Sequence, residues 1–172
     1  MDELDPARRE LLIGGVMAAI AAGMAGGAQA SPLDSAQTII IPKGEIPWKP
    51  HPIYGGHVQE TCTLFGDPNK AGLYLSMIRW HIGFMSIPHY YDTDRICMVM
   101  SGTWWCNSGA DFDPKACVPV PAGGFVRRVA RTHHYDGVIS GGTEPVEVAV
   151  FGMGPINYKP SDPTRAQGYM RA

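Results

Sequence analysis

The sequence predicts an all-β domain, an antiparallel barrel or sandwich, preceded by an extended arm. Two observations support this: short apolar runs alternate with turn-forming clusters, and no helix-length amphipathic segment interrupts them. The runs include VQETCTLF, GLYLSMIRWHI, RICMVMSGTWWC and PVEVAVFGM, and the separators include GDPNKAG, NSGADFDPK and SGGTEP. Several short strands at this spacing are typical of an all-β sandwich or barrel.

Residues 1–30 are interpreted as an export signal. Arg8 and Arg9 precede an uncharged run rich in Gly and Ala, which ends in an A-x-A cleavage site before Ser31. The run is only weakly hydrophobic, so we predict no permanent membrane anchor. Adjacent arginines followed by two leucines favour the twin-arginine route. We expect a periplasmic or otherwise exported protein, cleaved near Ala30-Ser31.

The remaining chain divides into three parts. Residues 31–56 are rich in proline and lack helical periodicity, which indicates an extended arm that wraps the domain or a partner. Residues 57–156 contain the strand-like runs and form the predicted barrel. Residues 157–172 are interpreted as a loose C-terminal tail. We also expect a homodimer.

The charge balance excludes one class of partner. The chain has 14 basic and 16 acidic residues, and removal of the signal leaves a neutral remainder. Nucleic-acid binding needs clustered positive charge, so we predict no nucleic-acid partner.

The cysteines leave the redox question open. Cys62, Cys97, Cys106 and Cys117 show no C-x-x-C spacing, which argues against a zinc knuckle or a thioredoxin-type site. They either form disulfides in an oxidising compartment or remain buried free thiols.

One segment carries a spaced motif. From Gly83 the chain has five residues, His89, one residue, Tyr91, three residues, Arg95, six residues and Gly102. This spacing resembles the first motif of the cupin superfamily, G-x5-H-x-H-x3-E-x6-G, with Tyr91 at the second histidine and Arg95 at the glutamate. PHYYDTDR and SGTWW also resemble small exported bacterial cupin-domain proteins with a PHxHPxDR and SGTWW segment.

The second cupin motif is degenerate. Counting back from His134 puts Gly123 on its first glycine, whereas Val129 and Arg131 replace the proline and second glycine. The resemblance covers about residues 72–156. It implies a single cupin-type antiparallel β-barrel, a jelly roll or double-stranded β-helix, with an extended N-terminal arm.

The resemblance also implies a metal site. In metal cupins, three histidines and a glutamate hold Fe, Mn, Ni, Cu or Zn. Residue by residue, His89 and His134 are retained here, and Tyr91 takes a ligand position as a phenolate. Arg95 cannot ligate, because its guanidinium stays protonated. His81 and Glu60 are further donor candidates on neighbouring runs.

Several side chains have a structural and a functional interpretation. Arg95 either pairs with Asp92 or Asp94, or presents a fixed fork to a substrate anion, with Tyr91 as a catalytic acid or base. His81 either caps a strand or lines the substrate site. Trp104 either packs in the core or lines a pocket. The cluster Arg127, Arg128 and Arg131 is either a solvated strand face or a rim that attracts anions.

Three functions follow as hypotheses. The first is an exported enzyme acting on a small organic molecule, anionic or aromatic, with a divalent transition metal held by His89, His134 and Tyr91, and lyase, isomerase or dioxygenase chemistry. The second is a metal-free barrel that binds or senses a small ligand, or performs acid–base chemistry with Tyr91 and Arg95. A third is a dimeric structural protein that depends on its arm.

Overall fold

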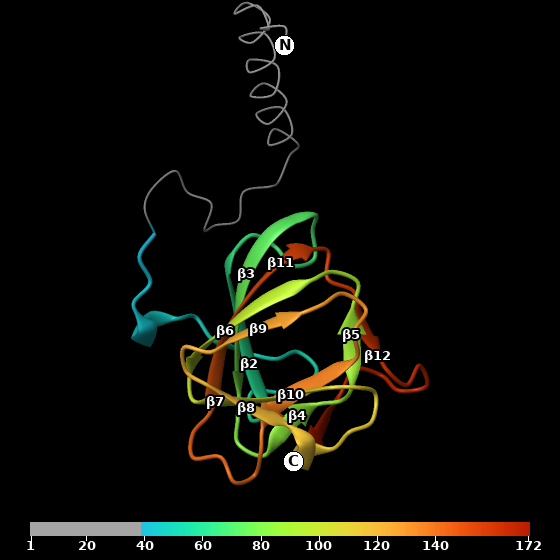
Figure 1. The fold of residues 1–172 in the computed structure, drawn as a ribbon. Coiled ribbons are helices and arrows are strands. Elements are labelled where there is room, and N and C mark those ends of the chain that lie inside the picture. Colours follow the sequence, from blue (N-terminus) through green and yellow to red (C-terminus); the bar gives the residue numbers. More distant parts are fainter. Residues whose placement is uncertain (1–38) are drawn as a thin grey trace, which may run out of the picture.

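The computed structural model describes residues 39–172, and within them the apolar runs form antiparallel strands. The predicted signal and the first part of the predicted arm lie outside the described residues. One sheet has the order β1-β2-β3-β11-β6-β9 (Figure 1). Its strands are β1 (Lys49–Pro50), β2 (Gln59–Phe65), β3 (Gly72–Trp80), β11 (Val146–Gly154), β6 (Arg95–Ser101) and β9 (Phe125–Arg128).

The second sheet faces the first and has the order β12-β5-β10-β4-β13, with β7 pairing with β10 and β8. These strands are β12 (Tyr158–Pro160), β5 (His89–Tyr91), β10 (His134–Val138), β4 (Phe84–Ser86), β13 (Tyr169–Arg171), β7 (Thr103–Ser108) and β8 (Val118–Pro121). The helices of the described residues are two 3₁₀ turns, η1 (Lys43–Glu45) and η2 (Pro114–Ala116), and none is long and apolar enough to cross a membrane. The predicted all-β jelly roll is confirmed.

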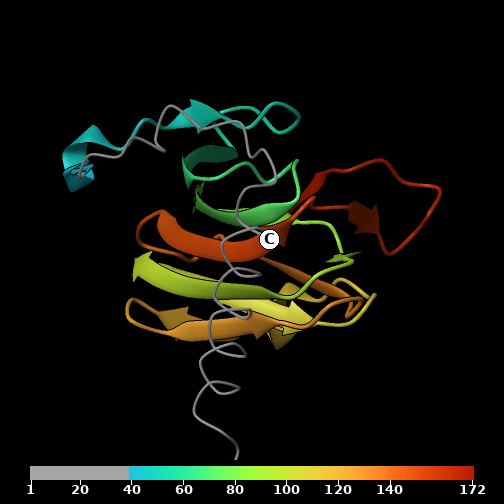
Figure 2. The same cartoon turned by 90° about the horizontal axis from the view of Figure 1, so that it is seen from above.

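Period-two alternation sorts the side chains of the first sheet between two environments. On β3, Tyr74 and Trp80 are buried between the sheets, whereas Leu73 faces outward and is exposed. The same alternation on β6 buries Cys97 and Val99 in the main core. Figure 2 shows the neighbouring strands side by side, and the inward residues of β3 and β6 belong to one buried cluster.

Strand pairing brings the motif residues together. On β5, His89 lies directly opposite His134 of β10. On β6, Arg95 pairs with Gly152 of β11 and with Arg128 of β9. The first motif ends at a turn where Gly102 has a φ of 70°. A Cβ at this position would meet the carbonyl oxygen of Pro145 at 2.5 Å. Glycine is therefore required at this turn.

The C-terminal part extends the barrel beyond residue 156. The tail predicted for residues 157–172 contains β12, which pairs with β5, and β13, which pairs with β4. Both strands protect edges that would otherwise expose unpaired backbone groups. The short length of each strand explains why periodicity did not indicate them. The four cysteines are free and buried in the described chain.

Candidate functional site

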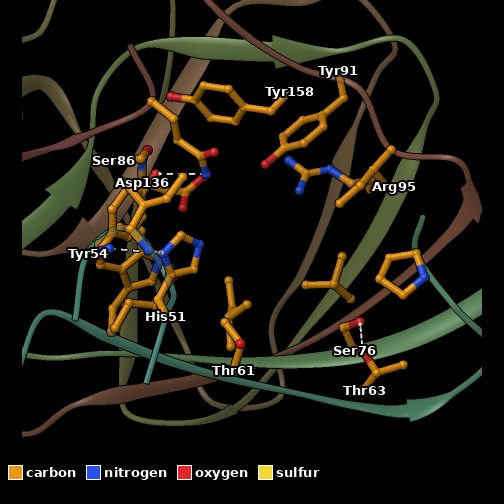
Figure 3. A pocket seen from close by; sticks show the side chains of 18 of the residues that line it. His51, Tyr54, Thr61, Thr63, Ser76, Ser86, Tyr91, Arg95, Asp136 and Tyr158 are labelled. Carbon is orange, nitrogen blue, oxygen red and sulfur yellow. Dashed lines mark hydrogen bonds between the residues drawn. The ribbon is translucent and has the colours of Figure 1, made fainter. Parts of the chain in front are cut away.

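A cavity of about 450 Å³ lies between the two sheets. His89, Tyr91 and Arg95 line one side of it, as the spacing of the first motif predicts, and Trp104 also faces it. Figure 3 shows the Tyr91 hydroxyl pointing into this space, with the Arg95 guanidinium beside the ring. His89 and Tyr91 stand two positions apart on β5, so strand alternation puts both on the cavity face.

The two histidines lie next to each other with fixed tautomers. Their ring centroids are 4.5 Å apart. Nδ1 of His89 lies 2.8 Å from the carbonyl oxygen of Ile87, and Nδ1 of His134 lies 2.8 Å from that of Thr132. A carbonyl only accepts, so each Nδ1 carries the hydrogen and each Nε2 keeps its lone pair.

Both imidazoles are neutral at physiological pH. Burial lowers the pKa of His89 to about 4, against the partly compensating charge of Asp136. Burial also lowers the pKa of His134, and the neighbouring His89 lowers it further. Desolvation disfavours the imidazolium, so both rings stay neutral and present Nε2 as a hydrogen-bond acceptor.

Arg95 occupies the centre of the site. Its Nη2 donates to Nε2 of His134 over 3.0 Å. Its guanidinium carbon lies 3.6 Å from the centroid of the Tyr91 ring, a close cation–π contact. Its Nε–H is buried and has no hydrogen-bond partner among the described residues.

Arg95 does not make the structural ion pairs that were one interpretation of its role. Asp94 instead accepts from Arg127, and Asp92 lies near Arg131 and Lys159. The two side chains cannot pair because Arg95 points inward from β6, whereas Asp94 lies outside the barrel. Within residues 39–172 no carboxylate lies within ion-pair distance of Arg95.

The cupin resemblance implies a divalent cation at this site. It brings His89, Tyr91 and His134 together as the sequence predicts. However, the Nε2 lone pair of His134 already accepts from Arg95, and a fixed positive charge lies where a carboxylate ligand would be needed. No group of three or more His, Cys, Asp or Glu side chains suited to a metal occurs in the described part of the chain. These residues do not fit a divalent cation.

Tyr91 keeps its phenolic proton. Burial raises the pKa of Tyr91, and this outweighs the opposite effect of the adjacent Arg95. A protonated phenol facing the cavity donates one hydrogen bond and accepts others. It can therefore act as an acid toward a bound molecule, but it is poorly suited to metal ligation as a phenolate.

A buried ion pair completes the electrostatics of the site. Nη2 of Arg128 lies 3.1 Å from Oδ2 of Asp136, and both side chains are almost fully buried. Trp104 packs in the core beneath this pair, 5.3 Å from the Arg128 guanidinium carbon. The negative charge of Asp136 is balanced by Arg128, whereas the positive charge of Arg95 has no such partner in the described chain. The cavity therefore has a net positive charge.

The other candidates lie elsewhere. His81 faces Glu60 at 3.2 Å in a network with Arg79 on the outer face of the first sheet, and neither His81 nor Glu60 lines the cavity. The basic cluster separates by alternation: Arg127 and Arg131 are exposed, whereas Arg128 is buried.

Sequence reasoning missed several cavity residues. Asp136 stands two positions after His134 on β10, so alternation could have placed it on the same face. Tyr158 comes from the segment predicted to be a tail, and it stacks on His89 with a centroid distance of 4.7 Å. Tyr54 lies in the predicted arm and lines the opposite wall in Figure 3. No local pattern marked either tyrosine.

Comparison with solved structures identifies the architecture. The chain is similar to the polyketide cyclase RemF from Streptomyces resistomycificus, with 12% identity and a TM-score of 0.58 over 72% of this chain and 85% of that one. It is similar to an RmlC-like cupin protein from Ralstonia eutropha, with 15% identity and a TM-score of 0.57 over 82% and 83%. KdgF from Halomonas sp. shares 13% identity, with a TM-score of 0.50 over 69% and 96%.

No family model matches the sequence. No curated protein matches it significantly either. At these identities the structural likeness establishes the fold alone. Together with the two facing antiparallel sheets and the paired strands that carry His89 and His134, it shows that the chain has the cupin fold.

Proposed function

We propose that the chain binds a small organic anion in the barrel cavity without a metal ion. The observation that carries this proposal is the guanidinium of Arg95, which faces the cavity, has no carboxylate partner among the described residues and hydrogen-bonds to Nε2 of His134. A partly buried cation is costly without a counter-charge. A bound carboxylate would supply that charge and accept from the free side of the fork.

The same site supports proton transfer. With the anion held by Arg95, the Tyr91 hydroxyl is the proton donor and Nε2 of His89 is the acceptor. Neither group needs to change its resting protonation state to begin, because burial keeps the phenol protonated and the imidazole neutral. This division of roles favours an isomerisation or elimination within the ligand. The fold neighbours include a polyketide cyclase, and they support a small-molecule enzyme or binder in general terms.

Metal content and anion binding together test this proposal. Chelator-treated protein is titrated with small carboxylates in a calorimeter, and the protein as purified is analysed for metals. We expect carboxylate binding that added Zn²⁺, Ni²⁺ or Fe²⁺ does not improve. A metal content near one ion per chain in the purified protein, lost in His89→Ala, contradicts the proposal. It would favour the alternative, a metal-dependent enzyme.

We further propose a homodimer through the outer face of the first sheet. Six large apolar side chains on this face are exposed: Leu73, Ile96, Met100, Phe125, Phe151 and Met153. Cross-strand register makes them contiguous, because Phe151 lies opposite Ile96, and Met153 lies opposite Leu73. Isolated monomers rarely expose apolar groups gathered in this way.

A second copy of the chain fits this face because its charges are already paired within the chain. Arg79 binds Glu60 and Glu147, and Arg127 binds Asp94. Two identical faces can therefore meet about a twofold axis without like-charge repulsion. Sedimentation should show a dimer that Phe151→Glu dissociates, whereas Val118→Glu on the second sheet leaves it intact. A monomeric wild-type protein, or equal dissociation by both variants, contradicts the dimer.

Export stays a proposal, since residues 1–30 lie outside the described residues. N-terminal sequencing of the protein from its native host should begin at Ser31. An intact N-terminus would contradict cleavage at this site.

A further inference from the structure

The wall of the cavity that faces Arg95 is polar, which is unusual for a barrel interior. Figure 3 shows Thr61, Thr63 and Ser76 across the cavity from Tyr91 and Arg95. They come from β2 and β3, where alternation points them inward. Inward positions of a β-barrel core are normally apolar, so hydroxyl groups here need a partner.

Two of these hydroxyl groups form a hydrogen bond with each other, and the third, that of Thr61, does not. The hydroxyls of Thr63 and Ser76 lie 3.2 Å apart. Thr61 has no side-chain hydrogen bond to any described residue, although it lines the cavity.

Gln59 extends this wall, because it lines the same cavity and is only 5% exposed. Independent evidence for a polar ligand comes from the indole N–H groups of Trp80 and Trp104. Both side chains line the cavity, and both N–H groups are buried without a hydrogen-bond partner among the described residues. Leaving such groups unpaired costs free energy, and a ligand with hydroxyl groups would supply acceptors for them.

We infer that the ligand is a hydroxylated carboxylic acid, of the sugar-acid type. The inference rests on the proposed function: the carboxylate lies on the Arg95 guanidinium, and the hydroxyl groups face the wall that contains Gln59 and Thr61. A hydroxyl both donates and accepts, which matches the mixed capacity of an amide and neighbouring hydroxyls. A wholly apolar or aromatic acid would leave these groups buried and unpaired.

The aromatic side chains of the cavity agree with this assignment. Tyr54, Tyr74 and Trp80 also line it, and the last two come from β3, the strand that carries Ser76. Their faces provide apolar surface for the C–H groups of a ligand whose polar groups point to either side.

Three kinds of six-carbon probe distinguish the contribution of the carboxylate to binding from that of the hydroxyl groups. Gluconate, galactonate and glucuronate carry a carboxylate and hydroxyls, hexanoate carries the carboxylate alone, and glucitol carries hydroxyls alone. Calorimetry should show that at least one of the hydroxylated acids binds about tenfold or more tightly than hexanoate, because two or more extra hydrogen bonds form. Glucitol should bind more weakly than that acid.

Variants of the polar wall provide the second measurement. Gln59→Met and Thr61→Val keep side-chain size, and each should reduce the preference over hexanoate severalfold while leaving hexanoate affinity unchanged. Thr103→Val, on the outer side of β7, is the matched control and should change neither. Thermal unfolding of each variant confirms that the barrel is intact.

The outcomes distinguish this inference from the function on which it rests. If hexanoate binds as tightly as the hydroxylated acids, or if Gln59→Met and Thr61→Val leave the preference unchanged, the hydroxy-acid assignment is overturned while anion binding stands. If no carboxylate binds at all, both are overturned.

Discussion

Replacement of Arg95 by methionine is the most informative single perturbation of this protein. Methionine keeps an unbranched apolar side chain, but removes the charge, the guanidinium that stacks on Tyr91 and every N–H donor. The carboxylate of the ligand would then lose its charged hydrogen bonding to the guanidinium, and we take the contribution of a single such bond, about 1.5–3 kcal/mol, as the expected loss. We therefore expect the tightest-binding carboxylate probe to lose affinity by about 10-fold to about 150-fold in calorimetry.

The same variant should keep nearly the stability of the wild type. A loss of binding in this variant would then not be caused by a loss of the folded structure. Arg95 has a buried Nε–H without a partner and no carboxylate at ion-pair distance among the described residues. Replacement of such a cation by an apolar group of similar size is commonly neutral or stabilising. Because the variant also leaves Nε2 of His134 without its donor, we expect the gain and the loss to offset each other and the melting temperature to stay close to that of the wild type.

Arg127→Met is the matched control, because it removes the same charge from an exposed position outside the cavity. It should change carboxylate affinity by less than about threefold, since exposed charges contribute little. An affinity for carboxylates that survives in Arg95→Met within a factor of about two would refute the clamp. A marked loss of stability in Arg95→Met would refute the argument that the guanidinium is uncompensated.

Three further predictions follow from the same geometry. Burial lowers the pKa of His89 from its ordinary 6.5 to about 4, so the unfolded state binds more protons between these values; unfolding free energy should fall by about 3 kcal/mol as pH drops across this window. His89→Gln should flatten this part of the stability profile whereas exposed His57→Gln should not, and equal profiles would contradict the assignment. The double variant Tyr91→His/Arg95→Glu restores the donor types of a metal cupin and should gain binding of Zn²⁺ or Ni²⁺ by calorimetry; failure to bind either ion while folded would show that substitution at these positions is not what prevents metal binding. Asp136→Asn leaves a buried guanidinium unpaired and should cost about 3–5 kcal/mol in urea unfolding, and a loss below about 1 kcal/mol would contradict a tightly coupled pair.

The strand pattern could be predicted from sequence because alternation is local. Successive residues of a strand point to opposite sides, so the shared direction of His89 and Tyr91 followed from their numbering alone. The same rule could have added Asp136, two positions after His134, to the site.

Other parts of the site had no local signal. Tyr158 lies on a three-residue strand inside a segment rich in turn formers, and Tyr54 lies in a proline-rich stretch. Both reach the cavity only because strands distant in sequence pair with one another. The inward direction of the hydroxyls on β2 follows from alternation. Their role in ligand binding could be inferred only once Arg95 was placed on the opposite side of the cavity.

The sequence by itself determined the all-β architecture, the sharing of faces along each strand and the replacement of two ligand positions in the first motif. These features depend on neighbours within a few residues and on residue chemistry. Only the tertiary structure decided what Arg95 does. Its hydrogen bond to His134 joins residues 39 positions apart, and that contact exists because β6 and β10 face each other across the barrel. Asp94 was the nearer candidate in sequence, but it points away from the barrel interior because adjacent side chains of an extended chain alternate.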